Sequence, residues 1–463
     1  MLYDLDMTLK QLGEDAGAAA IFDRFLPGMR QQVGQNPMAA NFSLRKLLAW
    51  AGDRFPKEAG EALDRALREY GKTADHTPAE KAKMADYQKI AEDDHRRAVE
   101  KAARSDKAPY DAIYPGRVWL DTKGERIQAH GGALHCEDGV YYWYGENKEH
   151  TDGKSDIWTW GIRVYRSADL YNWEDLGLLI PPVLDDPDSN LFPDKRLDRP
   201  HIRRCPATGK YVAWIKLSGE EACFIILQAD AFLGPYTVVR ENYNPLGCKV
   251  GDFDIVQDPA SGKAYLYLDA DHKGVLCLEM AEDMLSAEKK VSEQYMGLIP
   301  PFCREGIALF ERGGRKYMLS SGMTGYIPNQ SDSAVSEAWD APFISKGDPC
   351  VDDPTLSSFN SQFTQIFQLP DRDLYVALCD RWVPDYPLDA DLADLFRRCI
   401  ASRYDPAHYH TTAEEQAILS AAPMLETANT SVANYVWLPL TFDGCRVRIR
   451  WQDRWTVESI IHY

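Results

Sequence analysis

The chain has 463 residues, more than one ordinary hydrophobic core accommodates, so we expect two domains. Hydrophobic residues make up 45% and charged residues 27% of the sequence, which is typical of a globular protein and excludes a disordered one. The formal net charge of −19 argues against nucleic acid and anionic membranes as partners, because both require basic patches.

The first residues, from Met1 to Asp6, contain neither a basic n-region nor an apolar h-region, and no run approaches 18 apolar residues. We therefore expect no signal peptide and no membrane span. The ten cysteines include no C-x-x-C pair, which argues against a zinc site and a disulfide framework. Reduced thiols and a cytoplasmic location follow as expectations.

Residues 1–108 have a helical pattern. Thr8 and Gln11 have the spacing of a capping box, and Leu44, Leu47 and Leu48 follow Ser43 at helical spacing. Thr77, Pro78 and Glu80 form a stronger helix start, with an N-cap, a proline at N1 and a glutamate at N3. We expect a packing, linking or oligomerisation module here, and the sequence does not indicate the oligomeric state.

From about residue 109 to residue 463 the pattern changes to short strands between Gly, Asp and Asn turns. A short apolar strand, a turn and a Tyr-rich strand recur five times, about 50–70 residues apart. This favours an all-β five-bladed β-propeller after the N-terminal α-helical region; the alternative is a sandwich, which seldom repeats one hairpin five times. The second-strand tyrosines are Tyr141, Tyr211, Tyr265, Tyr317 and Tyr375.

A polar and helical stretch, about residues 385–430, interrupts the last blade before strand pattern resumes at residue 435. This insertion carries His408 and His410. They could bind a metal ion, but no third ligand has helpful spacing, which favours solvated loop histidines.

A propeller gathers the innermost strand of every blade around one axis, so one polar residue at the same place in each repeat predicts a common pocket. A lone Asp in a turn is usually only a turn residue, but equivalent positions in five repeats form a joint signal. The candidates are His130 with Glu146, then Asp198 with Arg199, then Asp252, Glu305 and Gln362.

Hydrolysis of a glycosidic bond needs a protonated acid and a group that activates or positions water. Glu305 and Asp252 suit an acid and a neighbour that raises its pKa, because two close negative charges resist coexisting. Arg199, Arg304 and Arg381 either offset this charge or bind hydroxyls, or form structural salt bridges. The 12 Trp and 24 Tyr suit stacking on sugar rings, although core packing explains most of them.

The motifs IQAHGGALHCEDGVYYWYGENK, DRPHIRRCPATGKYVAWIK, GDFDIVQDPASGKAYLYLD, REGIALFERGGRKYMLSS and FNSQFTQIF occur in this order. From about Val118 to Trp455 the chain resembles glycoside hydrolase family 43, most closely its exo-β-1,3-galactanase-like branch. The resemblance implies a five-bladed propeller that acts by inversion, with Glu305 as general acid and Asp252 as the aspartate that tunes its pKa.

Most members of this family have an Asp base in the first blade, where this chain reads Ala129 to Gly132 without a carboxylate. The galactanase-like branch shares that absence, and there a fifth-blade Gln, here Gln362, handles the water by orienting it or as its imidic tautomer. The resemblance places sugar-holding carboxylates at Glu146 and Asp198.

We also expect His130 and Arg199 to hold hydroxyls and Trp382 or Trp158 to stack on the ring. The chain departs from the branch in having Asp198 in place of Glu and Gly306-Ile307 in place of Ala-Pro after the acid.

The sequence thus predicts an inverting exo-acting glycoside hydrolase that releases a terminal sugar, of β-galactosyl type, from oligosaccharides. The alternatives are a β-xylosidase or α-L-arabinofuranosidase of the same fold, a non-catalytic carbohydrate-binding propeller, and a phosphorylase on a similar propeller. Some family members carry calcium on the propeller axis, but no EF-hand loop is visible here. We assign no cofactor and no metal.

Overall fold

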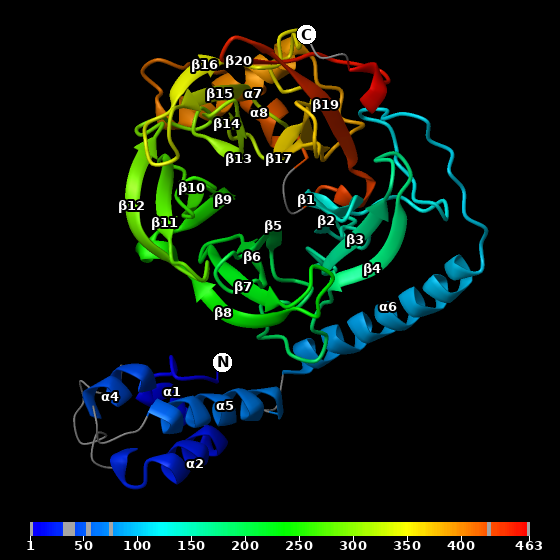
Figure 1. The fold of residues 1–463 in the computed structure, drawn as a ribbon. Helices are drawn as coiled ribbons and strands as arrows, with labels where there is room; N and C mark the ends of the chain where they lie inside the picture. Colours follow the sequence, from blue (N-terminus) through cyan, green and yellow to red (C-terminus); the bar gives the residue numbers. More distant parts are fainter. Residues whose placement is uncertain (1–2, 31–41, 52–56, 74–76, 424–426, 461–463) are drawn as a thin grey trace. The chain divides into compact units, whose positions relative to one another are not determined.

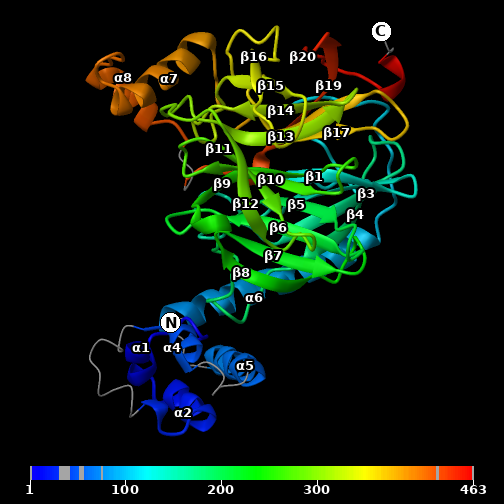
Figure 2. The same cartoon turned by 60° about the vertical axis from the view of Figure 1, so that its left-hand side comes forward.

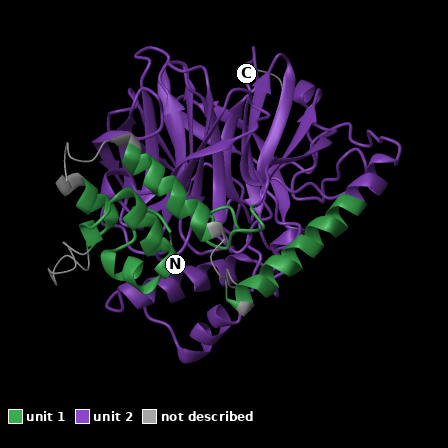
Figure 3. Ribbon diagram, turned by 90° about the horizontal axis from the view of Figure 1, so that it is seen from below, with its two compact units in different colours: residues 1–96, 183–192 green, residues 97–182, 193–463 purple. Residues whose placement is uncertain are grey.

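The chain folds as two compact units, residues 1–96 with 183–192, and residues 97–182 with 193–463 (Figure 3). The first division lies inside a helix, Pro78–Ala102 (α6), ahead of the boundary expected at residues 108 and 109. The structure is a computed structural model, and it describes residues 3–30, 42–51, 57–73, 77–423 and 427–460.

The N-terminal region is helical, as expected. Thr8 and Gln11 form the predicted capping box, and Thr77 and Glu80 bond reciprocally at the start of α6. Leu12, together with other buried leucines and Phe22, forms the hydrophobic core of the first unit. The helices are α1 (Leu9–Glu14), α2 (Ala16–Phe25), α4 (Leu44–Ala51), α5 (Lys57–Thr73) and α6.

The second unit is a five-bladed β-propeller, which confirms the predicted fold (Figure 1). Each blade is a four-stranded antiparallel sheet of strands consecutive in sequence. The blades are β1 (His130–Glu137), β2 (Val140–Glu146), β3 (Ile162–Ser167) and β4 (Glu174–Ile180); β5 (Leu197–Arg204), β6 (Tyr211–Leu217), β7 (Cys223–Ala229) and β8 (Thr237–Tyr243); β9 (Val250–Gln257), β10 (Ala264–Ala270), β11 (Val275–Met280) and β12 (Ala287–Gln294); β13 (Glu305–Arg312), β14 (Arg315–Ser321), β15 (Ser331–Ser336) and β16 (Ile344–Gly347); and β17 (Gln362–Gln368), β18 (Tyr375–Arg381), β19 (Asn434–Asp443) and β20 (Arg446–Ile449).

The first strands of the blades form a closed inner ring. β1 contacts β5 and β17, β9 contacts β5 and β13, and β13 contacts β17. The five repeated tyrosines lie at the beginning of the second strand of each blade, as the repeat predicted. Because each blade begins at the ring, the residue that opens each first strand lies near the axis.

The segment before the first blade bonds to the segment after the last blade and so helps to close the propeller. Ile113 forms an antiparallel bridge with Trp455, through main-chain bonds of 2.9 and 3.0 Å. The Trp455 indole donates to the Trp437 carbonyl oxygen at 2.8 Å, and both rings are buried in one aromatic cluster. The first and last segments of the propeller are therefore held to each other.

The predicted insertion in the last blade lies between β18 and β19 and carries two helices, α7 (Ala390–Tyr404) and α8 (Ala413–Ser420) (Figure 2). The side chains of Asp389 and Thr412 cap these helices. An apolar cluster joins α7, through Phe396, to Tyr326 and Trp382 of the propeller.

All ten cysteines are free thiols, as their spacing predicted. Within the described part of the chain, we find no helix with the length and apolar character that crossing a membrane requires.

Replacing Trp455 by alanine will destabilise the propeller, because it removes a buried indole that holds the last segment of the propeller to the first. The expected loss is about 3–5 kcal/mol, visible by calorimetry as a lower melting temperature. The control is Val118→Ala, since Val118 is 44% exposed and its loss will change stability by no more than about 0.5 kcal/mol. Equal melting temperatures for the two variants would contradict this account of closure.

Candidate active site

A cavity of about 390 Å³ opens at the end of the ring where the first strands begin. All five blades contribute to its wall, so the five distant segments meet as the sequence predicted. The polar and aromatic wall includes Glu146, Trp158, Asp198, Arg199, Lys216, Asp252, His272, Glu305, Tyr326, Gln362 and Trp382. A cavity of this size with convergent polar groups suits one sugar ring and its hydroxyls.

Asp252 is held as a carboxylate anion by two cations. Its oxygens lie 2.6 Å from the Lys216 ammonium and 3.0 Å from the Arg199 guanidinium, and one accepts the Gly306 amide at 3.0 Å. Burial by itself would raise the pKa of Asp252, but the charges of Arg199 and Lys216 outweigh it and hold this pKa well below its ordinary value.

Glu305 differs from Asp252 in that its pKa is raised. Burial first, and then the negative charge of Asp252, raise the pKa of Glu305 to about 8. The carboxyl is therefore largely protonated at neutral pH, which is what proton donation requires. The tuning role of Asp252 stays a prediction, and the charge of Asp252 acts on the pKa of Glu305 in the direction that this role requires.

Gln362 links Glu305 to Arg199, the cation that pairs with Asp252. Its Nε2 donates to Glu305 Oε1 at 2.9 Å and to Ser321 Oγ at 3.0 Å. Its Oε1 accepts from the Arg199 guanidinium, a group that can only donate, so Arg199 fixes which end of the amide is oxygen. Both N–H groups are in use, and the remaining lone pair of Oε1 can accept a hydrogen bond from water.

Arg199 lines the cavity, and of the roles left open for it, its contacts favour charge compensation over a hydroxyl contact. Its guanidinium serves Asp252, Gln362 and the Phe363 carbonyl oxygen, and its main-chain amide donates to Glu146 Oε1 at 2.8 Å. Its φ of 55° is in the left-handed region, which costs a non-glycine residue about 1–2 kcal/mol. The structure thus makes Arg199 a positioning residue.

Glu146 and Asp198 also line the cavity, as expected. Glu146 Oε2 lies 2.9 Å from the Lys148 ammonium, and burial, only partly opposed by Lys148, raises the pKa of Glu146 to about 7. Asp198 accepts bonds from the Trp158 indole, at 2.7 Å, and from the Ser218 hydroxyl. These carboxylates are acceptors suited to sugar hydroxyls.

Both tryptophans proposed for stacking line the cavity, but their surroundings differ. Two cations, Lys148 and Arg196, each lie 4.8 Å from the ring centroid of Trp158. Trp382 packs instead against Tyr326, with centroids 5.3 Å apart, and both rings line the cavity. Trp382 is the better candidate for the apolar face of a sugar.

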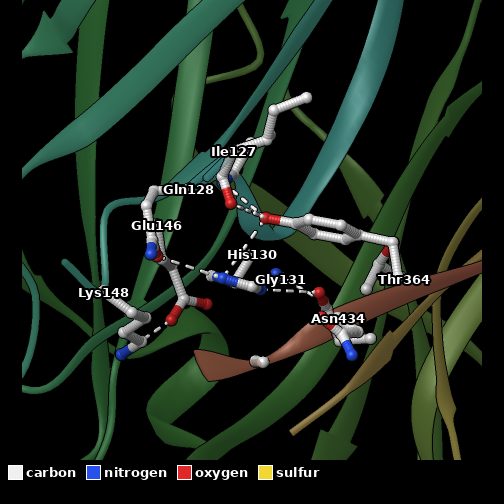
Figure 4. A network of polar contacts seen from close by, with 12 residues as sticks. Ile127, Gln128, His130, Gly131, Glu146, Lys148, Thr364 and Asn434 are labelled. Carbon is white, nitrogen blue, oxygen red and sulfur yellow. Dashed lines mark hydrogen bonds and ion pairs between the residues drawn. The ribbon is translucent and has the colours of Figure 1, made fainter. Parts of the chain in front are cut away.

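His130 does not line the cavity, which corrects its expected hydroxyl contact. The ring is fully buried, with Nδ1 at 3.0 Å from Asp380 Oδ1 and Nε2 at 3.2 Å from Gln128 Oε1 (Figure 4). The adjacent Gly131 amide donates to Asp380 at 2.7 Å. His130 therefore supports the strand end beside Glu146 and leaves the sugar to other groups.

Sequence reasoning missed Lys216, Ser321 and Lys148. A signal existed, because the hairpin register pairs Asp198 with Lys216 and Glu305 with Ser321. Each missed residue of these two pairs lies at the end of a second strand, directly opposite a candidate at the start of a first strand.

Among the described residues of the cavity wall, no three carboxylate, imidazole or thiolate groups have ligand atoms within 4.8 Å of one another. His408 is exposed and bonds Asp405 through Nδ1 at 2.9 Å, which agrees with a solvated loop histidine.

The model of glycosyl hydrolases family 43 matches residues 132–386. No curated protein matches the sequence. Among solved structures, the chain is similar to the family 43 β-1,3-galactosidase BT0265, with 24% identity and a TM-score of 0.58 over 75% of this chain and 64% of that one.

Two further structures show the same fold. The β-1,3-galactosidase BT3683 is 23% identical, with a TM-score of 0.57 over 74% of this chain and 100% of its own. An exo-β-1,3-galactanase from Phanerochaete chrysosporium, solved with galactose, is 21% identical, with a TM-score of 0.59 over 75% of this chain and 68% of its own.

Replacing Gly306 by alanine will impair the site because a Cβ there would lie 2.9 Å from both Gln362 Cγ and Ser321 Oγ. Gly313→Ala is a matched control: φ is 57° against 59° at Gly306, but a Cβ meets nothing within 4 Å. Both variants will lose about 1–2 kcal/mol of stability from the backbone. Only Gly306→Ala will also lose turnover, and equal turnover in the two would refute the close fit.

Proposed function

The chain belongs to glycosyl hydrolases family 43, and on that basis we propose that it is an inverting, exo-acting hydrolase that releases terminal β-galactosyl residues from oligosaccharides. One observation carries this proposal: a protonated Glu305 lies in a sugar-sized cavity beside an aspartate held as an anion. A raised and a depressed carboxyl pKa in one site are the signature of separate acid and electrostatic roles.

In the proposed reaction Glu305 gives its proton to the glycosidic oxygen as the bond to the anomeric carbon breaks. Asp252 stays ionised throughout, because Lys216 and Arg199 hold its charge. Its nearby negative charge keeps the proton on Glu305 until the leaving oxygen accepts it.

Gln362 orients the attacking water in its ordinary amide form. The Arg199 guanidinium donates to Oε1, and the imidic tautomer would carry its own proton on that oxygen, opposing this donor. The water attacks the face of the sugar opposite to the leaving group, so the product has the inverted configuration. As its oxygen bonds the anomeric carbon, the water releases one proton to bulk solvent, and Glu305 then regains its proton from solvent.

The galactosyl preference rests on the similar structures. Two are named as β-1,3-galactosidases, and one is an exo-galactanase solved with galactose. Asp198 is one methylene shorter than the Glu expected from the resemblance to the galactanase-like branch, so the shape of the sugar-binding site can differ here. A panel of aryl β-galactoside, β-xyloside and α-L-arabinofuranoside tests which sugar the enzyme prefers. Cleavage of the pentosides alone would reassign the sugar.

Glu305→Gln will lower kcat/KM about 10²–10⁴-fold on a disaccharide, since the leaving sugar needs a proton. An aryl glycoside with an acidic leaving group will be affected much less. Glu311→Gln is the control, because Glu311 lies at the far end of β13, paired with Lys316. Retention of nearly full disaccharide activity by Glu305→Gln would eliminate the assignment.

The value of kcat/KM will fall as the pH rises through about 8, where Glu305 loses its proton. Asp252→Asn removes the anion that raises this pKa and leaves Lys216 and Arg199 facing the site, so the basic limb will move to lower pH. The measurement is a kcat/KM profile from pH 5 to pH 10. A limb that stays in place or moves upward would contradict the tuning role.

A further inference from the structure

The cavity has a closed end and an open side. At the closed end Glu146, Arg199 and Asp252 are at most 7% exposed. On the open side lies the turn between β10 and β11, where the side chains of Asp271 and His272 are 39% and 51% exposed. An exo-acting enzyme holds the terminal sugar at the closed end, so the leaving group extends toward the open side.

His272 is fixed firmly for a residue so exposed. Its Nδ1 lies 2.6 Å from Asp269 Oδ2, and its main-chain amide donates to Asp269 Oδ1 at 2.9 Å. Asp269 is buried and fits only because residue 251 is glycine: a Cβ there would lie 2.2 Å from Asp269 Oδ2. Both Asp271 and His272 have left-handed φ values, 52° and 58°.

This arrangement leaves one nitrogen of the ring for a ligand. Because Nδ1 is committed to Asp269, the ring offers Nε2 to the cavity that it lines. A buried carboxylate orients this imidazole, and the turn that carries it is strained. Packing requires neither feature, so both indicate a functional role for His272.

We propose that His272, oriented by Asp269, forms the leaving-group subsite and binds a hydroxyl of the departing sugar through Nε2. The inference rests on the proposed function and adds to it the chemistry of the leaving group: a hydroxyl-bearing sugar, in place of an apolar aglycone.

Electrostatics support the position of His272 next to the acid. The hydrogen bond with Asp269 raises the pKa of His272, and its positive charge in turn lowers the pKa of Glu305. The charged groups that interact with the ring include the carboxyls of Asp269, Glu305, Asp252 and the neighbouring Asp271. His272 and Glu305 therefore lie close enough in one cavity for their charges to interact, as a subsite for the leaving sugar requires.

The test compares a β-galactosyl disaccharide with 4-nitrophenyl β-galactoside at pH 6.5, using wild type, His272→Ala and His272→Gln. Loss of a charge-assisted hydrogen bond will lower kcat/KM on the disaccharide about 10- to 100-fold, mostly through KM. The aryl substrate has no hydroxyl at this place and will change less than about twofold. Lys273→Ala is the control, since Lys273 is exposed and does not line the cavity.

The pH profile of kcat/KM on the disaccharide, whose leaving sugar needs the Glu305 proton, gives a second readout, which a merely structural role would not move. His272→Ala removes a positive charge near Glu305, so the basic limb will shift to higher pH, opposite to the shift for Asp252→Asn.

Equal losses on both substrates, or an unchanged disaccharide KM, would overturn the subsite while leaving the hydrolase proposal intact. A wild-type enzyme that cleaves neither galactoside would overturn the proposed function and this subsite with it.

Discussion

The site depends on the ion pairs that Asp252 makes with Arg199 and Lys216. Two cations keep this buried carboxylate ionised, and burial together with its charge raises the pKa of Glu305. The same guanidinium fixes the amide of Gln362, so acid, tuner and water-orienting group are set by one network. Removing one partner would leave an unpaired buried charge, which costs far more than an exposed pair contributes.

Much of this could be predicted from sequence because a propeller repeats. The five hairpin tyrosines indicated the blades, and the polar residues at or near the start of the first strands indicated Asp252, Glu305 and Gln362. Strand starts are local features with fixed positions in each repeat, and the closed ring turns them into a common wall.

The sequence did not predict which partners each side chain contacts. Charge compensation and hydroxyl binding were both open for Arg199, and its guanidinium compensates the charge of Asp252 and bonds Gln362. His130, expected to hold hydroxyls, is buried against Asp380. Such roles depend on rotamers and on which partner lies across the blade, which periodicity does not encode. Lys216 was within reach of a register argument, since it lies directly opposite Asp198.

The insertion with α7 and α8 enters the last blade after β18, once the hairpin that supplies Gln362 is complete. The polar groups of the site come mainly from the first two strands of each blade and the turns beside them. The two outer strands therefore tolerate insertions between them and the inner hairpin. An insertion at this place changes the surroundings of Trp382, and with them the sugar preference, without moving the residues that transfer the proton.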